Sequence, residues 1–424
     1  MLALCRFSVK SRKVGAGGVL LKYKMAKIIT DENRIKEFLE SRYVETVLPS
    51  KEKAEEMLSS GRQLTFYLGI DPTGPDIHLG HTTNLFVLKE LFQLGHKIVL
   101  LIGDFTAMIG DPTDKEAVRR PLTGKEVKEN MRTYLDQVRK ILSKDSFETK
   151  YNGKWYRKML TEEWLKLTSL FTQQQMVGRD MFQERIKKDK PISLQEFVYP
   201  VLQGYDSVAM EVDGEIGGKD QMFNMMVGRD LVNKILGKEK LVITTRLLEN
   251  LATGKKIMSK SEGQYISLND SPQEMFGKTM AMPDSAIVPL LAYATELPDS
   301  EVDRAQKKLS AGENPRNLKE ELAFELVRMY HGEKEAKKAK DEFRKVFSEG
   351  QLPEEIKEYK FSGDSIVIVD LLEGSGTVGS RSEAKRLIDE GAVKVNGKTV
   401  SGWDYEVERG DVIKVGPRKF VRAV

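Results

Sequence analysis

Cysteine is almost absent from this sequence. The only one is Cys5, so the chain cannot form an internal disulfide, whereas small secreted domains commonly depend on several. We therefore expect a reducing compartment, the cytoplasm. Long apolar runs are missing too, because no stretch approaches the roughly 20 residues that a membrane-spanning helix needs. These two absences argue against a disulfide-stabilised secreted scaffold and against a helical membrane protein.

Acidic residues are missing from residues 1–24, although that segment carries six lysines and arginines. Such a composition is typical of an organelle transit peptide, and also of translated upstream sequence ahead of a start at Met25. The segment has no sustained amphipathic arginine face, so we favour the second interpretation. We expect residues 1–30 to be an extension outside the folded body.

Internal repeats and a dedicated protein metal site are also not recognisable. At 424 residues the chain is long enough for two or three domains. Its apolar content of 40% and charged content of 31% are ordinary for a soluble protein. The net charge of +4 is mildly basic and does not by itself establish a nucleic-acid partner.

One stretch, residues 64–95, has the order strand, loop, helix. Residues 64–70 are apolar and β-prone, residues 71–77 are rich in turn formers, and a helical period starts at residue 78, with Asp76 placed to cap it. A second buried strand is predicted at 98–102. This βα unit predicts an α/β fold with a Rossmann-type parallel sheet.

Two histidines begin the predicted helix. The first N–H groups of a helix lack intrahelical partners and attract anions, and His78 and His81 add directed donors. Gly80 between them removes a side chain where a nucleotide would approach the backbone. These features predict a phosphate site. The alternative is a histidine pair that only caps the helix.

Residues 254–263 form a loop rich in lysine, serine and glycine. Lys260 is a mobile cation there, and Ser259 and Ser261 are donors for a polyphosphate; the alternative is an ordinary solvated loop. Together, His78-Leu-Gly-His81 and this loop resemble the HIGH and KMSKS signatures of class I aminoacyl-tRNA synthetases. Ile257 stands where that family has its first lysine, and whether Lys256 replaces it stays open.

The segment 193–210 predicts a helix with a polar row. Tyr199, Gln203 and Asp206 are spaced i, i+4 and i+7, so they project from one face and suit a small zwitterion or a phenol. Asp111 lies in a Gly-Asp-Pro turn after the 98–102 strand, and Gln221 follows a glycine pair at a probable strand end. Ligands of parallel α/β sheets bind at such strand ends.

These motifs jointly are similar to the bacterial tyrosyl-tRNA synthetase family. The resemblance implies a tyrosine--tRNA ligase that uses ATP with Mg²⁺, binds tRNA(Tyr), and forms a homodimer, with no tightly bound protein metal. It implies catalytic roles for His78, His81, Lys260 and Ser261. It implies tyrosine binding by Tyr67, Asp111, Tyr199, Gln203, Asp206 and Gln221, and ATP binding by Gly69, Asp71, Thr73, His78, Gly80, His81 and Lys260.

The predicted domains follow from breaks in the pattern. They are a catalytic domain at 31–270 with a helical insertion at about 113–190, a helical domain at 271–347, a linker at 348–364, and a small α+β domain at 365–424. The last resembles an RNA-binding fold first named for a small-subunit ribosomal protein, and a purely stabilising domain is the alternative. Its expected RNA patch is Arg381, Lys385, Arg386 and Lys394.

Two other functions remain open at this point. A tryptophan enzyme of the same class is disfavoured by the pair Tyr67 and Asp206, which suits a phenol. A non-catalytic RNA-binding protein with a synthetase-like body is conceivable because of Ile257.

Overall fold

The computed structural model describes residues 27–113, 122–178, 180–250, 253–254, 256–258, 265–348, 356–416 and 419–424. It divides into two compact units, and each is described by itself. The first contains the described residues up to Asn269 together with Ser285–Gly312. The second contains Asp270–Asp284 and the described residues from Glu313 onward. Residues 285–312, which we expected in a helical domain at 271–347, thus cluster with the first unit.

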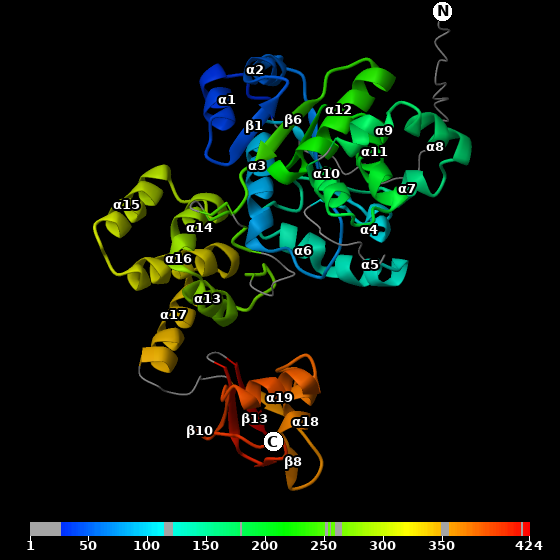
Figure 1. Ribbon diagram of the computed structural model, residues 1–424. Helices are drawn as coiled ribbons and strands as arrows, with labels where there is room; N and C mark the ends of the chain where they lie inside the picture. Colours follow the sequence, from blue (N-terminus) through cyan, green and yellow to red (C-terminus); the bar gives the residue numbers. More distant parts are fainter. Residues whose placement is uncertain are drawn as a thin grey trace, which may run out of the picture. The chain divides into compact units, whose positions relative to one another are not determined.

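A six-stranded sheet forms the centre of the first unit (Figure 1). Its strands lie in the order β1-β6-β5-β2-β3-β4, and all neighbours are parallel except β1 with β6. Strands β3 and β6 are nearly continuous apolar runs, as expected where helices cover both faces. The bounds are β1 Val44–Leu48, β2 Thr65–Ile70, β3 Lys97–Ile102, β4 Glu148–Tyr151, β5 Gly214–Gly218 and β6 Leu241–Thr245. The predicted α/β fold class is confirmed.

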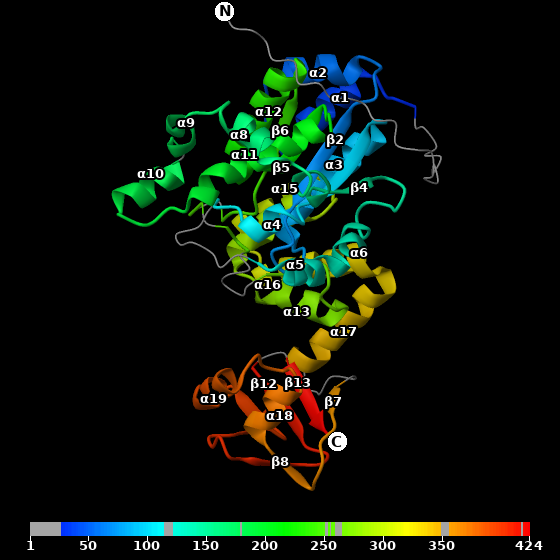
Figure 2. The same cartoon turned by 90° about the vertical axis from the view of Figure 1, so that its right-hand side faces the viewer.

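The strand order reverses between β5 and β2. From β2 the chain crosses to β3 on one side, and from β5 it crosses to β6 on the other. Because such crossovers are right-handed, the connecting helices α3 (Thr82–Gln93) and α12 (Met222–Leu236) lie on opposite faces of the sheet (Figure 2). Ligands of open α/β sheets bind at this reversal, beyond the carboxyl ends of the strands.

Helix α11 (Leu194–Ala209) packs closely along α12. Gly204 makes this approach possible, because a Cβ there would lie 3.0 Å from the backbone nitrogen of Gly228. The helix agrees with the predicted 193–210 to within one residue, and Ser193 is its N-cap. Its polar row is therefore held against the sheet by the close contact with α12.

The apolar residues from Val127 to Leu142 recur at helical spacing and so predict one long helix, which they do not form. They form α5 (Gly124–Asn130), the 3₁₀ turn η2 (Met131–Thr133) and α6 (Tyr134–Val138). Successive side chains bind carbonyls of the loop after β2: Asn130 reaches Pro72 O at 3.0 Å and Gln137 reaches Pro75 O at 3.0 Å. The prediction was wrong because docking on this loop, which periodicity cannot reveal, interrupts the helix.

Shorter helices complete the first unit. Helices α1 and α2 match the predicted segments near 32–42 and 50–59. After β4, the insertion continues as four short helices before α11. The bounds are α1 Glu32–Leu39, α2 Lys51–Ser59, α4 Thr106–Ile109, α7 Gly153–Tyr156, α8 Thr161–Thr168, α9 Gln173–Val177, α10 Asp180–Lys187, α14 Ile287–Ala294 and α15 Asp299–Ser310.

The second unit contains three packed helices and a small α+β part. The helices are α13 (Pro272–Ala281), α16 (Pro315–His331) and α17 (Glu333–Ser348). The α+β part has a sheet in the order β10-β9-β12-β13-β7 and a pair β11-β8. Its bounds are β7 Lys357–Tyr359, β8 Ser365–Val367, α18 Ile368–Gly374, α19 Arg381–Asp389, β9 Val393–Val395, β10 Lys398–Thr399, β11 Glu406–Glu408, β12 Val412–Val415 and β13 Lys419–Ala423.

Two details of the C-terminal sheet bear on the sequence prediction. The Asn-Gly pair within residues 393–400 predicts a hairpin, and this is confirmed, because Asn396 and Gly397 both have positive φ between β9 and β10. Strand β7 pairs in parallel with β13, although its residues fall in the predicted linker at 348–364. A three-residue, charged edge strand leaves no periodicity from which to predict it. No helix in the described part of the chain is both long and apolar enough to cross a membrane.

Candidate active site

A chain of hydrogen bonds connects two carboxyl groups, that of Asp71 after β2 and that of Asp206 on α11. Asp71 follows β2 and accepts hydrogen bonds from the Tyr199 hydroxyl and the Thr106 hydroxyl, both at 2.7 Å. Asn152 follows β4 and donates to Thr106 Oγ1 at 2.9 Å and to Asp206 Oδ2 at 3.3 Å. Residues from α4, α11 and two strand ends thereby meet at the predicted edge of the sheet.

Asp206 is 3% exposed and is surrounded by donors. Its Oδ1 accepts from Trp155 Nε1 at 2.9 Å and from the Tyr156 hydroxyl at 2.8 Å. Burial raises the pKa of Asp206 from 3.8 to about 8, although the hydrogen bonds from Tyr156, Asn152 and Trp155 lower it. Burial also raises the pKa of the Tyr156, Tyr67 and Tyr199 hydroxyls, which therefore keep their protons at neutral pH.

The raised pKa of Asp206 predicts a pH-dependent stability. Between about pH 4 and pH 8 the folded protein holds a proton on this carboxyl that the unfolded chain lacks. The stabilisation from this group is complete below the unfolded pKa and is lost as the pH rises through the folded value. Thermal unfolding of the ligand-free protein should therefore show a Tm that falls from pH 6 to pH 9. Asp206→Asn should make that fall smaller, and an unchanged slope would contradict the assignment.

A second chain starts at Tyr67, which is fully buried in β2. Its hydroxyl lies 3.0 Å from Ser207 Oγ, and Ser207 Oγ accepts a hydrogen bond from Lys240 Nζ at 2.8 Å. Lys240 also forms an ion pair with Glu215 of β5, and the side chains of the pair are 0% and 2% exposed. A buried ion pair therefore lies beside Tyr67, which is predicted to bind the substrate phenol.

The second chain continues from Glu215 to the end of β3. Gln203 Nε2 donates to Glu215 Oε1 at 3.0 Å. Asn224 of α12 donates to the amide oxygens of both Gln203 and Gln221, each at 3.0 Å. Gln221 Nε2 in turn donates to Asp111 Oδ2 at 2.7 Å. The amide groups are therefore held in defined orientations by a buried asparagine.

The two hydrogen-bond chains contain all six residues to which the resemblance assigns binding of the substrate tyrosine. The structure brings them to one place, while their roles in binding remain predictions. Thr106, which the sequence after the 98–102 strand already directs toward the crevice, holds Asp71. Sequence reasoning missed the other supporting residues: Asn152, Trp155, Tyr156, Ser207, Glu215, Asn224 and Lys240. Two signals were available, namely the polar cluster directly after β4 and a glutamate within the otherwise apolar and glycine-rich β5.

The turn with the two histidines is more closed than predicted. It is a 3₁₀ turn, η1 (Leu79–His81), ahead of α3. Its N–H groups are used internally: Leu79 N donates to Ile266 O at 3.0 Å, and Gly80 N donates to His78 Nδ1 at 3.1 Å. The expectation of open backbone donors was therefore wrong. Because His78 Nδ1 accepts a hydrogen bond, the neutral ring carries its proton on Nε2.

Gly80 has a structural role that we did not expect, and Asp76 has a different role from the expected cap. A Cβ at Gly80 would lie 2.8 Å from His78 Cε1, so the glycine makes room for the imidazole itself. Asp76 does not cap this turn, because His78 does. Asp76 instead accepts from the Tyr265 hydroxyl and Asn269 Nδ2, both at 3.0 Å. It therefore fastens the loop after β2 to the segment that follows the lysine-rich loop.

The other predicted ATP residues lie along the same edge. Gly69 is in β2, and Thr73 is in the loop after it, where its N–H donates to Asp71 O at 2.8 Å. Asp71 itself belongs to the first chain. Ser259, Lys260 and Ser261 lie outside the described residues. Lys256 is described, and its Nζ forms an ion pair with Asp220 Oδ2 at 2.8 Å, directly before Gln221.

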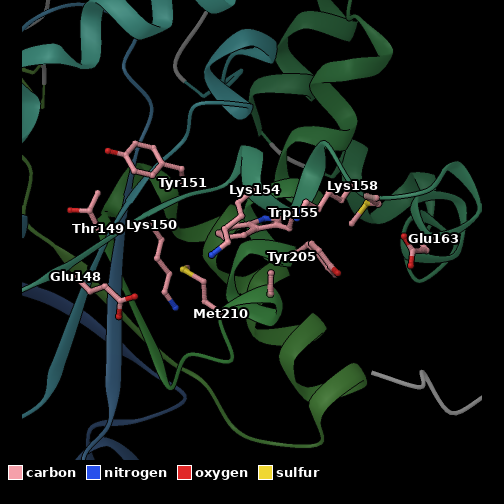
Figure 3. A pocket seen from close by; sticks show the side chains of 12 residues that line it. Glu148, Thr149, Lys150, Tyr151, Lys154, Trp155, Lys158, Glu163, Tyr205 and Met210 are labelled. Atoms are coloured by element: carbon pink, nitrogen blue, oxygen red, sulfur yellow. The ribbon is translucent and has the colours of Figure 1, made fainter. Parts of the chain in front are cut away.

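A cavity of about 540 Å³ is lined by residues of β4, α7 and α11 and of the segment after α7 (Figure 3), and Trp155 is the one described residue of the two hydrogen-bond chains that lines it. Lysine side chains and aromatic rings line it, among them Lys150, Lys154, Trp155, Lys158 and Tyr205. Trp155 belongs to both places, because it lines the cavity and its Nε1 donates to Asp206. The candidate active site is therefore defined by the two hydrogen-bond chains and not by this cavity.

Comparison with protein families agrees with this geometry. Residues 59–348 match the family described as tRNA synthetases class I (W and Y), and residues 369–413 match the S4 domain. The chain belongs to the class I tRNA synthetase family. The synthetase match includes the histidine turn, both hydrogen-bond chains and α11. The S4 match covers most of the small α+β part.

Named relatives of this synthetase distinguish between the two amino acids of the family. It is 41% identical to the tyrosine--tRNA ligase of Carboxydothermus hydrogenoformans, over 90% of this chain and 96% of the relative. It is 40% identical to the tyrosine--tRNA ligase of Thermotoga maritima, over 93% of this chain and 98% of the relative. The synthetase is therefore a member of the tyrosine--tRNA ligase family, and the resemblance predicted from its motifs is confirmed.

Solved structures show the same fold at lower identity. A C-terminally truncated mitochondrial tyrosyl-tRNA synthetase from Aspergillus nidulans is 22% identical and has a TM-score of 0.60, covering 74% of this synthetase and 94% of that chain. A tyrosyl-tRNA synthetase from Archaeoglobus fulgidus complexed with L-tyrosine is 20% identical with a TM-score of 0.57, covering 73% and 99%.

The S4 part of the synthetase shows a mixed environment for the predicted RNA patch. Arg381 pairs with Asp370 at 2.5 Å, and Arg386 pairs with Glu390 at 2.7 Å. Lys385 Nζ lies 4.7 Å from the ring centre of Trp403, which is 47% exposed. Lys394 is exposed on β9. An exposed ring beside a cation offers a stacking surface that the sequence prediction omitted.

Proposed function

We propose that this synthetase activates L-tyrosine with ATP to tyrosyl-adenylate and transfers the tyrosine to the 3′ end of tRNA(Tyr). The observation that carries the proposal is the buried Asp206 carboxylate with the Tyr67 hydroxyl near it. A phenol needs a partner that accepts its proton and a partner that donates to its oxygen, and these two side chains provide both. Kinship with tyrosine--tRNA ligases at about 40% identity supports the same assignment.

The other end of the amino acid is an ammonium group, for which acceptors are needed. In this proposal Asp111, Tyr199 and Gln203 hold it, with Gln221 nearby. The hydrogen bond from Gln221 to Asp111 and the bond from Asn224 to Gln203 support this arrangement, because they fix the direction of each group before the substrate arrives. Pre-positioned acceptors lower the ordering cost of binding.

The proposed reaction needs alignment and charge stabilisation more than acid–base chemistry. The substrate carboxylate is already ionised and attacks the α-phosphorus of ATP, while pyrophosphate leaves. His78, His81, Lys260 and Ser261 would stabilise the charge on the phosphate oxygens, and Gly69, Asp71, Thr73 and Gly80 would border ATP. The Nε2 proton of His78 supports its part as a donor. Magnesium would arrive on the phosphates of ATP, and a cytoplasmic location is part of the proposal.

Tyrosine-dependent exchange of labelled pyrophosphate into ATP tests the function directly. Exchange with tyrosine and not with tryptophan or phenylalanine is expected. Exchange with tryptophan would favour the other enzyme of the class. A protein that gives no exchange with any amino acid but still binds tRNA would be a non-catalytic RNA-binding protein.

We expect removal of the S4 part to uncouple the two half-reactions. Deletion should start at residue 349 rather than 365, because β7 belongs to the C-terminal sheet. The proposed activation residues all precede residue 262, so exchange should survive. Aminoacylation should weaken, and the dependence of log K on log salt should become shallower by about 0.7–0.9 for each lost phosphate contact. Equal charging by full-length and truncated protein would contradict the role of this part.

Homodimerisation is the last part of the proposal, and exposed apolar side chains of the insertion and of the start of α11 support it. Leu194, Leu160, Leu165 and Ile186 are 82%, 65%, 62% and 50% exposed. Leu165→Glu with Leu194→Glu should convert a dimer to a monomer in light scattering after gel filtration. Tyr405→Glu, at an exposed position of the S4 part, is the control and should leave the dimer intact. A dimer that survives the double change would place the interface elsewhere.

A further inference from the structure

The ion pair between Lys240 and Glu215 is buried next to Tyr67 and has no assigned role. Removing two charges from water is costly, and an apolar pair of similar size is often as stable or more stable. Lys240 Nζ lies 5.8 Å from the centre of the Tyr67 ring and donates to Ser207 Oγ, the neighbour of the Tyr67 hydroxyl. Its position suggests an effect on that hydroxyl.

The hydrogen bonds at Ser207 determine the direction of the Tyr67 hydroxyl proton. An ammonium group has donors and no acceptor, so Ser207 must accept the hydrogen bond from Lys240. The proton of Ser207 then needs an acceptor, and the hydroxyl oxygen of Tyr67 at 3.0 Å provides it. A buried hydroxyl proton without an acceptor would destabilise the folded protein. With Ser207 as the donor, the proton of Tyr67 must point away from Ser207.

Glu215 is the group that competes for the proton of Tyr67. Its charge is among those that raise the pKa of this hydroxyl. Both carboxylate oxygens of Glu215 are engaged, one by Lys240 and the other by Gln203 Nε2 at 3.0 Å. Lys240 thus acts twice: it makes Ser207 a donor, and its charge and hydrogen bond weaken Glu215 as an acceptor for the Tyr67 proton.

We propose that Lys240, paired with Glu215, is a positioning residue that turns the Tyr67 proton toward the substrate. Tyr67 then donates to the substrate phenol oxygen, and Asp206 accepts the phenol proton. The inference rests on the proposed tyrosine specificity and adds a direction to it. The site therefore prefers a substrate whose para group accepts one hydrogen bond and donates one over a substrate whose para group donates well but accepts poorly.

Two variants separate this positioning role from a structural one. Lys240→Met with Glu215→Gln removes the pair without leaving a lone buried charge, and Ser207→Ala removes the link while keeping the pair. Exchange kinetics with tyrosine, phenylalanine and 4-aminophenylalanine give two ratios of kcat/KM. Both variants should lower the tyrosine-to-phenylalanine ratio, on the order of tenfold for loss of one directed hydrogen bond. Both should also lower the ratio to 4-aminophenylalanine, since a freed Tyr67 can accept from an N–H group.

A matched control is available in the same unit. Arg185 and Glu196 form another buried pair, 3% and 7% exposed, at 3.0 Å. Arg185→Met with Glu196→Gln should leave both ratios unchanged even where it lowers stability. In a double-mutant cycle, loss of the Lys240 pair should have little further effect on the ratios once Ser207 is alanine.

The outcomes distinguish failure of the positioning role from failure of the proposed function. Equal loss of activity with all three substrates, or unchanged ratios in Ser207→Ala, would overturn the positioning role. Ser207→Ala keeps the ion pair, so this test holds even where the Lys240 variant does not fold. Wild-type protein without tyrosine exchange would instead overturn the proposed function itself.

Discussion

Asp206→Asn should remove much of the discrimination between tyrosine and phenylalanine. An asparagine Oδ1 can still accept from Trp155 and Tyr156. Its Nδ2, however, then faces Asn152 Nδ2, which lies 3.3 Å from the present Asp206 Oδ2, and a donor there cannot accept the phenol proton. A buried phenol proton left without an acceptor costs about 1–3 kcal/mol, so the ratio of kcat/KM values should fall by a factor on the order of 10 to 10².

The measurement is pyrophosphate exchange with both amino acids. Tyrosyl-tRNA synthetases are the measured case of such selectivity, about 10⁵-fold without editing, and that magnitude is taken from them rather than obtained from this structure. For this synthetase we likewise expect rejection of phenylalanine to occur in the binding site. Tyr67→Phe is the companion variant and should have a smaller effect, because Asp206 still accepts the phenol proton. An Asp206→Asn protein with the wild-type ratio would mean that the phenol is recognised elsewhere.

Lys260→Ala should slow tyrosyl-adenylate formation with little change in tyrosine binding. A cation in the lysine-rich loop matters most when negative charge develops on the departing pyrophosphate. Loss of one such stabilising contact typically costs about 2.7–4 kcal/mol, or 10²- to 10³-fold in kcat. Single-turnover formation of the adenylate measures the step, and tyrosine binding at equilibrium measures the rest.

Lys256→Ala is the matched control for this loop. Lys256 is held by Asp220 at 2.8 Å, and its side chain is 39% exposed, so we expect a smaller loss than for Lys260. An equal loss would show that Lys256 has taken over the role of the lysine that Ile257 replaces. Unchanged adenylate formation in Lys260→Ala would remove that residue from the mechanism.

Local patterns in the sequence determined most of the elements and the family. The strand, loop and helix at 64–95 were predicted because hydrophobic periodicity and turn formers act between near neighbours in the chain. The same holds for α11, whose polar row carries Tyr199, Gln203 and Asp206. The Asn-Gly hairpin was predicted for the same reason. Residue types at fixed spacing were also enough to indicate the synthetase family and a site that binds a phenol.

Only the tertiary structure decided which side chains support the phenol-binding site. Lys240 lies 33 residues beyond Ser207 in the chain, and Asn152 lies 54 residues before Asp206. No local pattern connects such residues, because their contact depends on how strands and helices pack. The same reason explains the errors. The interrupted helix after Gly124, the contacts of Asp76 and strand β7 were each set by partners distant in the sequence. Side-chain identity therefore indicated the chemistry of the site, whereas packing decided its proton directions and its shape.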